Sequence, residues 1–147
     1  MAKNYYEPMH TAEHILNQTM LKLHTGERSF TTHIERKKSK VDYKFTRDLS
    51  EQEKQVIEAK VNEIIDKHLD VSEKFLHIDK AKEIFNLERL PEGIGDKIRI
   101  IKVGDYDSCP CIGQHVNNTC EIGKFKIVSS SFNDGVLRMR FKLLNEQ

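Results

Sequence analysis

The sequence lacks three features that would each have indicated a class of protein. It has no apolar run long enough to cross a membrane, and its N-terminal segment has no apolar stretch of the secretory type. It also has no excess of basic residues, because 24 lysines and arginines are balanced by 23 aspartates and glutamates to give a net charge of +1. A site for a polyanion therefore has to be a local patch. We expect a cytoplasmic protein with neither a membrane nor DNA as its partner.

Cysteine is scarce as well. The three cysteines, Cys109, Cys111 and Cys120, form an odd set that is clustered in one predicted loop, which begins with the segment DSCP. A gap of a single residue between the first two is poor geometry for a disulfide, and cytoplasmic thiols are usually kept reduced. We expect these residues to be free thiols or metal ligands.

Hydrophobic spacing predicts two main helices in a chain of 147 residues. Apolar residues at helical spacing predict one helix from about 8 to 24, ending near Gly26, and a second from about 51 to 69. Ser50 followed by a glutamate three residues later forms the capping box that starts the second helix. The length is usual for one compact domain, and we find no internal repeat or linker, so we predict a single domain over 1–147.

The remaining segments predict strands. Alternation of apolar and polar residues predicts a hairpin over about 29–45 with a basic turn at 36–40, and a strand pair at 125–132 and 136–144 joined by an Asn-Asp-Gly turn. Together with the helices this is an α+β fold: an antiparallel sheet with helices packed on it. The predicted elements between these segments are a strand near 71–78, a short helix near 79–86, the loop LPEGIGD at 90–96 and the strand KIRIIKV at 97–103.

The segment HTAEH at 10–14 places two histidines in the first turns of the first helix. Residues four apart lie on the same helical face, with Cβ atoms about 5–6 Å apart, so His10 and His14 are able to share one metal ion. Read as H-x-x-E-H, the segment is also the inverted zinc-peptidase motif, in which Glu13 would be the general base. Two helical histidines alone are more often solvated or hydrogen-bonded than metal ligands, so a second half-site is needed.

A second pair occurs in the segment DSCPCIGQHV, where Cys111 and His115 are again four residues apart. The two pairs together offer three imidazoles and one thiolate, the nitrogen and sulfur donors that zinc prefers. Cys109 is out of register with His115, and we interpret it as a neutral thiol or a group behind the ligands. Cys120 is interpreted as structural or incidental.

These residues carry a resemblance to a known family. HTAEHIL, CIGQHV followed by NNTCEIG, and the last two strands resemble the editing domains of alanyl- and threonyl-tRNA synthetases, in particular their free-standing relatives, the alanyl-tRNA editing proteins of AlaX type. The resemblance runs from the first helix to the last strand. It implies a zinc ion at the mouth of a cleft and hydrolysis of the ester of a mischarged tRNA, typically serine or glycine on alanine tRNA. By resemblance the zinc ligands are His10, His14, Cys111 and His115.

The resemblance also implies further roles. The family does not require a carboxylate at the position of Glu13, which would then be a helix-surface residue. The partner would be the acceptor end of a mischarged tRNA, and a protein without an appended synthetase domain would act on it in trans. No catalytic residue is indicated. The candidates for substrate recognition are the polar side chains of Ser29, Thr31, Thr32 and Gln114. The alternative is that these are ordinary residues that face solvent.

Two aspects stay open at this point. The loop that carries Cys111 and His115 reads Cys-Ile-Gly-Gln-His, whereas related domains often have two glycines there, so its contacts with the substrate are not defined. The role of the metal is also open, because zinc could activate water or orient the substrate. The alternatives to an editing hydrolase are a non-catalytic, zinc-stabilised tRNA-binding module or synthetase partner, and a zinc peptidase that depends on Glu13. Phosphates of the tRNA would be met by the basic residues Arg36, Lys37, Lys38, Lys40, Lys124, Lys126, Arg138 and Arg140.

Overall fold

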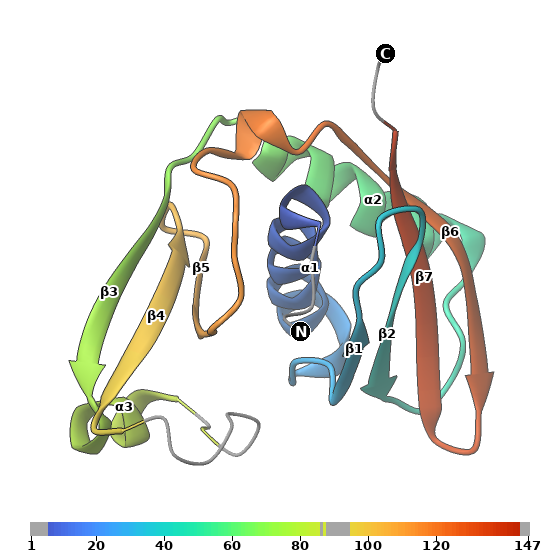
Figure 1. Ribbon diagram of the computed structural model, residues 1–147. Helices are drawn as coiled ribbons and strands as arrows, with labels where there is room; N and C mark the ends of the chain where they lie inside the picture. Colours follow the sequence, from blue (N-terminus) through green and yellow to red (C-terminus); the bar gives the residue numbers. More distant parts are fainter. Residues whose placement is uncertain (1–5, 86, 88–94, 145–147) are drawn as a thin grey trace.

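The computed structural model describes residues 6–85, 87 and 95–144 (Figure 1). Helix α1 (Glu7–Met20) lies between two antiparallel sheets. Pro8 occupies its first turn, where a missing N–H costs nothing. The helix continues as one π-helical turn (Leu21–Thr25) and stops at Gly26, which has the left-handed φ of 70° that glycine adopts without strain. The predicted first helix is therefore confirmed.

The larger sheet has the strand order β1-β2-β7-β6. Its last two strands alternate as predicted, because Leu137, Met139 and Phe141 are buried in the main core with α1 and α2. Asp134 and Gly135 both have positive φ in the turn between those strands, as the Asn-Asp-Gly sequence predicts. The bounds of these strands are β1 (Thr31–His33), β2 (Ser39–Lys44), β6 (Lys124–Asn133) and β7 (Val136–Leu144).

Helix α2 (Glu51–Ile65) covers one face of this sheet. Its capping box is present, since the Ser50 hydroxyl accepts from the Glu53 amide and the Glu53 carboxylate accepts from the Ser50 amide. The Asn62 side chain bonds to both the amide and the carbonyl of Phe125 and thereby joins the helix to β6. The helix ends a turn earlier than the sequence predicted.

The smaller sheet has the order β3-β4-β5. Helix α3 (Ile78–Ile84) packs on one of its faces through a separate small core of Ala81, Ile98 and Ile100. Phe75 is paired with Arg99, and Ile101 with Cys109, so these residues share the opposite face. The strands are β3 (Val71–His77), β4 (Lys97–Val103) and β5 (Asp107–Pro110).

The structure confirms the α+β class and corrects the prediction of one sheet, because the described strands form two. The segment DSCP was interpreted as part of a loop and is strand β5. It is an edge strand without hydrophobic alternation, so only its pairing with β4 identifies it. Most of the predicted LPEGIGD loop lies outside the described residues, and the single-domain organisation stays a prediction. Within the described part of the chain no helix is long and apolar enough to cross a membrane.

The central position of α1 explains an unusual property of that helix. Every residue from Met9 to Asn17 is buried, including the polar ones. Buried polar groups need partners, so the polar side chains of this helix have to interact with one another or with the surrounding strands and loops. The candidate site is built from these interactions.

Candidate functional site

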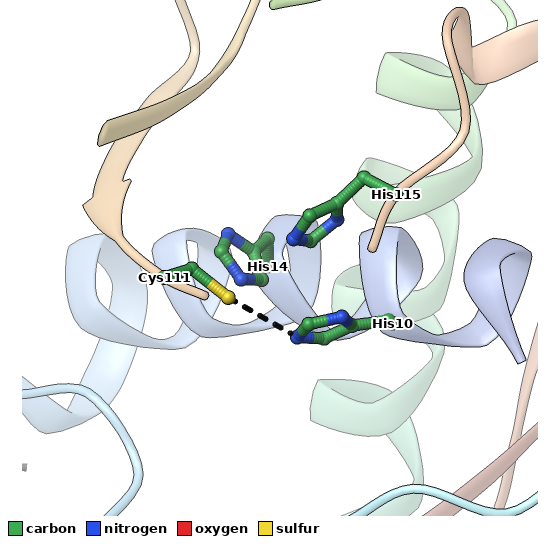
Figure 2. Close-up of side chains that lie close together, drawn as sticks. All are labelled: His10, His14, Cys111 and His115. Atoms are coloured by element: carbon green, nitrogen blue, oxygen red, sulfur yellow. Dashed lines mark hydrogen bonds between the residues drawn. The ribbon is translucent and has the colours of Figure 1, made fainter. Parts of the chain in front are cut away.

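Helix α1 and the loop after β5 bring four potential metal ligands together (Figure 2). His10 and His14 come from successive turns of the helix, and Cys111 and His115 come from the metal loop, defined here as 111–115. One ligand atom from each of the four lies within 4.8 Å of all the others. Cys109 is not part of this cluster, in agreement with the register argument from the sequence.

The four side chains converge in a regular arrangement. The rings of His10 and His115 stack with their centroids 4.1 Å apart, and the His14 ring is nearly perpendicular to both, at 5.2 Å and 4.4 Å. The Cys111 Sγ lies 3.4 Å from His10 Nε2. This arrangement directs nitrogen and sulfur atoms toward one point.

Two of the imidazoles have a hydrogen bond at Nδ1, and the Nδ1 atom of the third lies at ion-pair distance from a carboxylate. His10 Nδ1 donates to the Gln114 carbonyl at 3.0 Å, His115 Nδ1 is 2.9 Å from the Thr11 hydroxyl, and His14 Nδ1 is 3.5 Å from Asp107 Oδ2. Contacts of this kind orient metal-binding histidines and leave Nε2 for the ion. His115 Nε2 is buried, which leaves it inside the cluster as expected of a metal-ligating nitrogen.

The protonation states of the loop ligands also suit a metal. Burial alone would raise the pKa of Cys111, but hydrogen bonds with His10, His115 and His14 outweigh it and lower the pKa to about 3. Burial lowers the pKa of His115 to about 4. At neutral pH the cluster therefore offers a thiolate and a neutral imidazole, which are the forms that bind zinc. The donor set and its geometry fit that ion.

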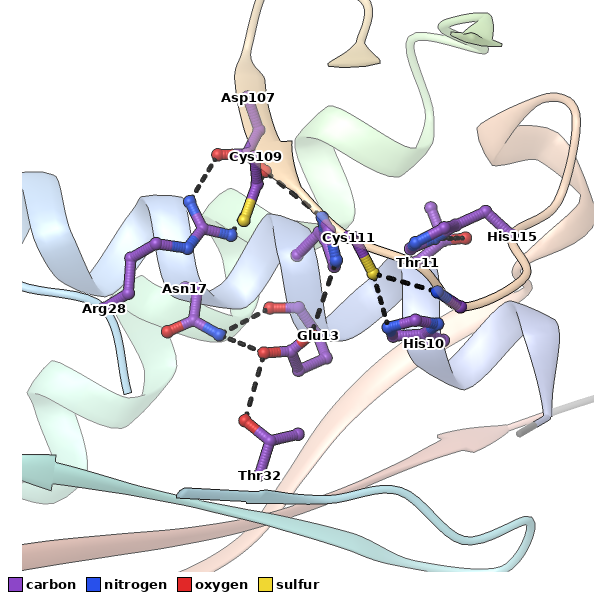
Figure 3. Close-up of polar contacts among 12 residues, drawn as sticks. His10, Thr11, Glu13, Asn17, Arg28, Thr32, Asp107, Cys109, Cys111 and His115 are labelled. Atoms are coloured by element: carbon purple, nitrogen blue, oxygen red, sulfur yellow. Dashed lines mark hydrogen bonds and ion pairs between the residues drawn. The ribbon is translucent and has the colours of Figure 1, made fainter. Parts of the chain in front are cut away.

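Asp107 lies next to His14 Nδ1 and forms an ion pair with Arg28, which Figure 3 shows. Its side chain is completely buried at the start of β5, and Arg28 binds both of its oxygens, at 2.8 Å and 3.3 Å. Burial raises the pKa of Asp107, but His14 and Arg28 outweigh burial and hold it below the ordinary value. Burial likewise lowers the pKa of His14, and the hydrogen bonds with Asp107 and Cys111 raise it well above the ordinary value. The carboxylate thus fixes the orientation of the imidazole.

Glu13 is not the helix-surface residue that the sequence predicted. Its side chain is only 9% exposed, because α1 is covered on both sides. One carboxylate oxygen, Oε2, accepts hydrogen bonds from Asn17 and from Thr32 on β1, while Oε1 lies 3.8 Å from His14 Nε2. Asn17 in turn accepts from the Ser29 amide, and the hydroxyls of Ser29 and Thr32 are 2.9 Å apart. Glu13, Asn17, Ser29 and Thr32 form a closed polar network beside the ligand cluster.

Comparison with known proteins shows which sequences the chain is similar to. Residues 98–140, which include most of β4, all of β5, the metal loop and β6, and the first half of β7, match the threonyl and alanyl tRNA synthetase second additional domain. The alanine–tRNA ligase of Oceanobacillus iheyensis is 36% identical over 132 residues, or 88% of this chain, and that of Bacillus anthracis is 34% identical over 149 residues, or 94% of this chain. The chain is related to this synthetase domain. It spans 15% and 17% of the length of these two ligases.

Two of the four residues predicted for substrate recognition, Ser29 and Thr32, belong to the polar network. Ser29 and Thr32 contact each other, and Thr32 contacts Glu13. Thr31 is exposed on the other face of β1, and the exposed Gln114 bonds to His10 only through its backbone carbonyl. The structure thus adds Glu13 and Asn17 to the candidates near the ligands.

Asp107 and Arg28 were missed by the sequence analysis. Asp107 precedes Cys111 by four residues, but nothing in the pattern separates it from an ordinary loop aspartate, and Arg28 belongs to a different part of the chain. Of the other two thiols, Cys109 has a pKa raised by burial, which is consistent with a neutral thiol, and Cys120 is exposed and free.

The backbone of Gly113 lies close to the His10 ring, and this contact leads to a prediction. A Cβ atom added there would lie 2.3 Å from His10 Cε1, and the His10 ring is held by Gln114 and cannot move aside freely. We expect Gly113→Ala to displace His10 and to weaken zinc binding at least about tenfold, as measured by competition with a chromophoric chelator. Thermal unfolding of Gly113→Ala, measured beside the wild type, is the control that separates a local loss at the metal loop from general destabilisation. Unchanged zinc affinity in Gly113→Ala would contradict the role assigned to His10.

Proposed function

We propose that this chain hydrolyses the ester of mischarged tRNA, with serine, or alternatively glycine, on alanine tRNA as its substrate and with zinc held by His10, His14, Cys111 and His115. The single observation that carries the proposal is the convergence of these four side chains within 4.8 Å in a relative of the alanyl-tRNA synthetase domain. We further propose that the protein is cytoplasmic and that it acts on tRNA in trans.

Zinc and the residues that orient its ligands have separate roles in this reaction. When bound, zinc supplies a Lewis acid that polarises an oxygen or lowers the pKa of water. Asp107, Gln114 and Thr11 hold the three imidazoles in the orientation that binds it. An aminoacyl ester is already activated, so the protein mainly has to position it and exclude competing substrates.

The polar network of Glu13, Asn17, Ser29 and Thr32 supports discrimination between amino acids. A site whose buried polar groups pair with a substrate hydroxyl rejects an analogue without that hydroxyl far more strongly than a difference of one methyl group would allow. Serine carries such a hydroxyl and alanine does not. We infer that the serine side chain is recognised by this network, in which Glu13 Oε1 has no hydrogen bond to a described residue.

The test is release of the amino acid from three purified esters: seryl-tRNA(Ala), alanyl-tRNA(Ala) and seryl-tRNA(Ser). Each is incubated with the zinc-loaded protein, with and without a chelator. Rapid, chelator-sensitive loss of serine from the alanine tRNA alone is the expected result. Survival of all three esters, and of glycyl-tRNA(Ala), would overturn the proposal.

One observation favours a second candidate, a zinc-stabilised tRNA-binding module without turnover. Four protein ligands form a closed set, which is typical of structural rather than catalytic zinc. The peptidase alternative is weaker, because the relatives reported above are alanine–tRNA ligases and not peptidases. The choice between enzyme and module is made by the His10 variant described in the Discussion.

Binding of tRNA leads to a prediction for the β1–β2 turn. Lys37 and Lys38 are exposed there, whereas Arg36 also packs over the Tyr6 ring at 4.3 Å. We expect Lys37→Gln/Lys38→Gln to weaken tRNA binding and to flatten the plot of log Kd against log salt, by roughly 0.7–0.9 for each phosphate that the turn no longer neutralises. Lys60→Gln/Lys67→Gln on and after α2 is a control with the same change of charge. Equal affinities and slopes for the two double variants would refute a role for the turn.

A further inference from the structure

A hollow of about 460 Å³ lies beside the metal loop. It falls within the range of about 300–1,000 Å³ that is usual for small-ligand sites. Two large apolar side chains stand exposed at this hollow, Phe75 on β3 at 57% and Ile112 in the metal loop at 63%. Among the described residues the hollow is lined by Phe75, Lys97, Ile98, Arg99, Ile112, Gly113 and Gln114.

We propose that this hollow binds the 3′-terminal nucleotide of the tRNA, with the base against Phe75 and Ile112 and the preceding phosphate next to Lys97. The proposal rests on the proposed function, since it places the nucleotide that carries the ester. It assigns a nucleotide site to Phe75, Ile112 and Lys97, none of which is one of the four potential metal ligands.

The apolar part of the hollow suits a base. An exposed aromatic ring offers a flat surface on which any base can stack, and such stacking is a general mode of binding single-stranded nucleic acid. Phe75 lies opposite Arg99 in the β3–β4 ladder, with no aromatic partner among the described residues to cover its ring. Ile112 adds apolar surface from the metal loop.

The two basic residues at the hollow have different roles. The Arg99 guanidinium is already engaged, because it pairs with Glu73 and donates to the carbonyls of Cys111 and Gly113. It therefore anchors the metal loop to the sheet. Lys97 is exposed and forms no ion pair with any described residue, and none of the described residues that line the hollow is acidic. Its charge is left for a phosphate, which is the group that lysine and arginine contact in nucleic acids.

The position of the hollow matches the geometry of an aminoacyl nucleotide. Gly113 lines the hollow and at the same time backs directly onto the His10 ring. Only the backbone of one residue therefore separates the proposed base site from the ligand cluster. An ester on the terminal ribose has to lie at the cluster, and its base then lies one sugar away, on the other side of this glycine.

The proposal is tested with uncharged tRNA, so that it does not depend on hydrolysis. Affinity is measured for intact alanine tRNA and for the same tRNA without its 3′-terminal nucleotide. We expect the wild-type chain to bind the intact tRNA about tenfold more tightly, the size of one base–aromatic stack. Phe75→Ala is expected to remove this difference, and Phe75→Tyr to retain it. Val56→Ala, at an exposed apolar residue of α2, is the matched control and should behave as the wild type.

Lys97→Gln gives an independent result. It should lower the salt slope for intact tRNA by roughly 0.7, the value for one phosphate on a single strand. Equal binding of the two tRNAs by the wild-type chain, or an undiminished difference in a folded Phe75→Ala, would overturn the proposal and indicate another occupant, such as a protein. Because uncharged tRNA is used, a failure of the deacylation assay alone would refute the proposed function and leave this result unaffected.

Discussion

Replacement of His10 by alanine is expected to abolish zinc binding and to lower the rate of deacylation by about 100-fold or more, while the chain stays folded. A Lewis acid contributes several kcal/mol to the stabilisation of a transition state, and about 2.7 kcal/mol corresponds to 100-fold in rate. His10 Nε2 is 3.4 Å from Cys111 Sγ, and His10 is not a member of the main apolar core, so its removal does not empty that core. The measurements are zinc content, single-turnover deacylation and thermal unfolding.

A matched control is available in His33. This exposed histidine on β1 pairs only with Glu35 among the described residues, so His33→Ala should keep zinc, activity and stability. If His10→Ala loses its cooperative unfolding together with its zinc, the metal is structural and the binding-module alternative is correct. If it keeps both zinc and activity, the ligand assignment itself is wrong.

Replacement of Asp107 by asparagine is expected to have the second large effect, and to act in two separable ways. Removal of the carboxylate behind a metal-binding histidine typically lowers metal affinity by about 10–100-fold, because the imidazole loses its fixed orientation. The same change leaves the Arg28 guanidinium without its counterion. Removing one partner of a buried ion pair costs about 3–5 kcal/mol, and we expect about 2–3 kcal/mol here because the Arg28 side chain keeps 26% of its surface exposed.

The stability effect has a definite pH dependence. The folded-state pKa of Asp107 lies below its ordinary value, against the effect of burial, because His14 and Arg28 favour the ionised form. Its contribution to stability is therefore fully present above the unfolded pKa of about 4 and is lost as the pH falls through the lower folded pKa. Asp107→Asn should be less stable than the wild type at neutral pH and should lose less stability on acidification below about pH 4. Denaturant unfolding at several pH values measures this.

A double variant separates the two effects. Arg28→Met/Asp107→Asn removes the unpaired guanidinium and should recover most of the free energy of unfolding that Asp107→Asn removes, because replacing both partners of a buried pair with groups of similar size is often nearly neutral. It should not recover zinc affinity, since His14 still lacks its carboxylate. Wild-type zinc affinity in Asp107→Asn would show that Asp107 serves only the ion pair with Arg28.

The features that depend on neighbouring residues were determined by the sequence alone. The i,i+4 spacing of His10 with His14 predicted that their rings approach each other, and the centroids are 5.2 Å apart. Cys111 was preferred to Cys109 by its register with His115, and it is the cysteine found in the cluster. The capping box at Ser50 and the turn at Asp134 and Gly135 were likewise predicted. Helical and strand periodicity and turn chemistry act over a few residues and can be read without knowledge of the fold.

Other features were decided only by the tertiary structure. Arg28 and Asp107 are 79 positions apart, and Thr11 and His115 are 104 apart, so neither contact has a local signal. Glu13 was expected on the helix surface and is buried, because Thr32 of β1, 19 positions away in the sequence, binds its carboxylate on this side of α1. Local periodicity specifies which faces of an element are apolar, whereas the partner of each buried polar group depends on how distant segments pack around the central helix.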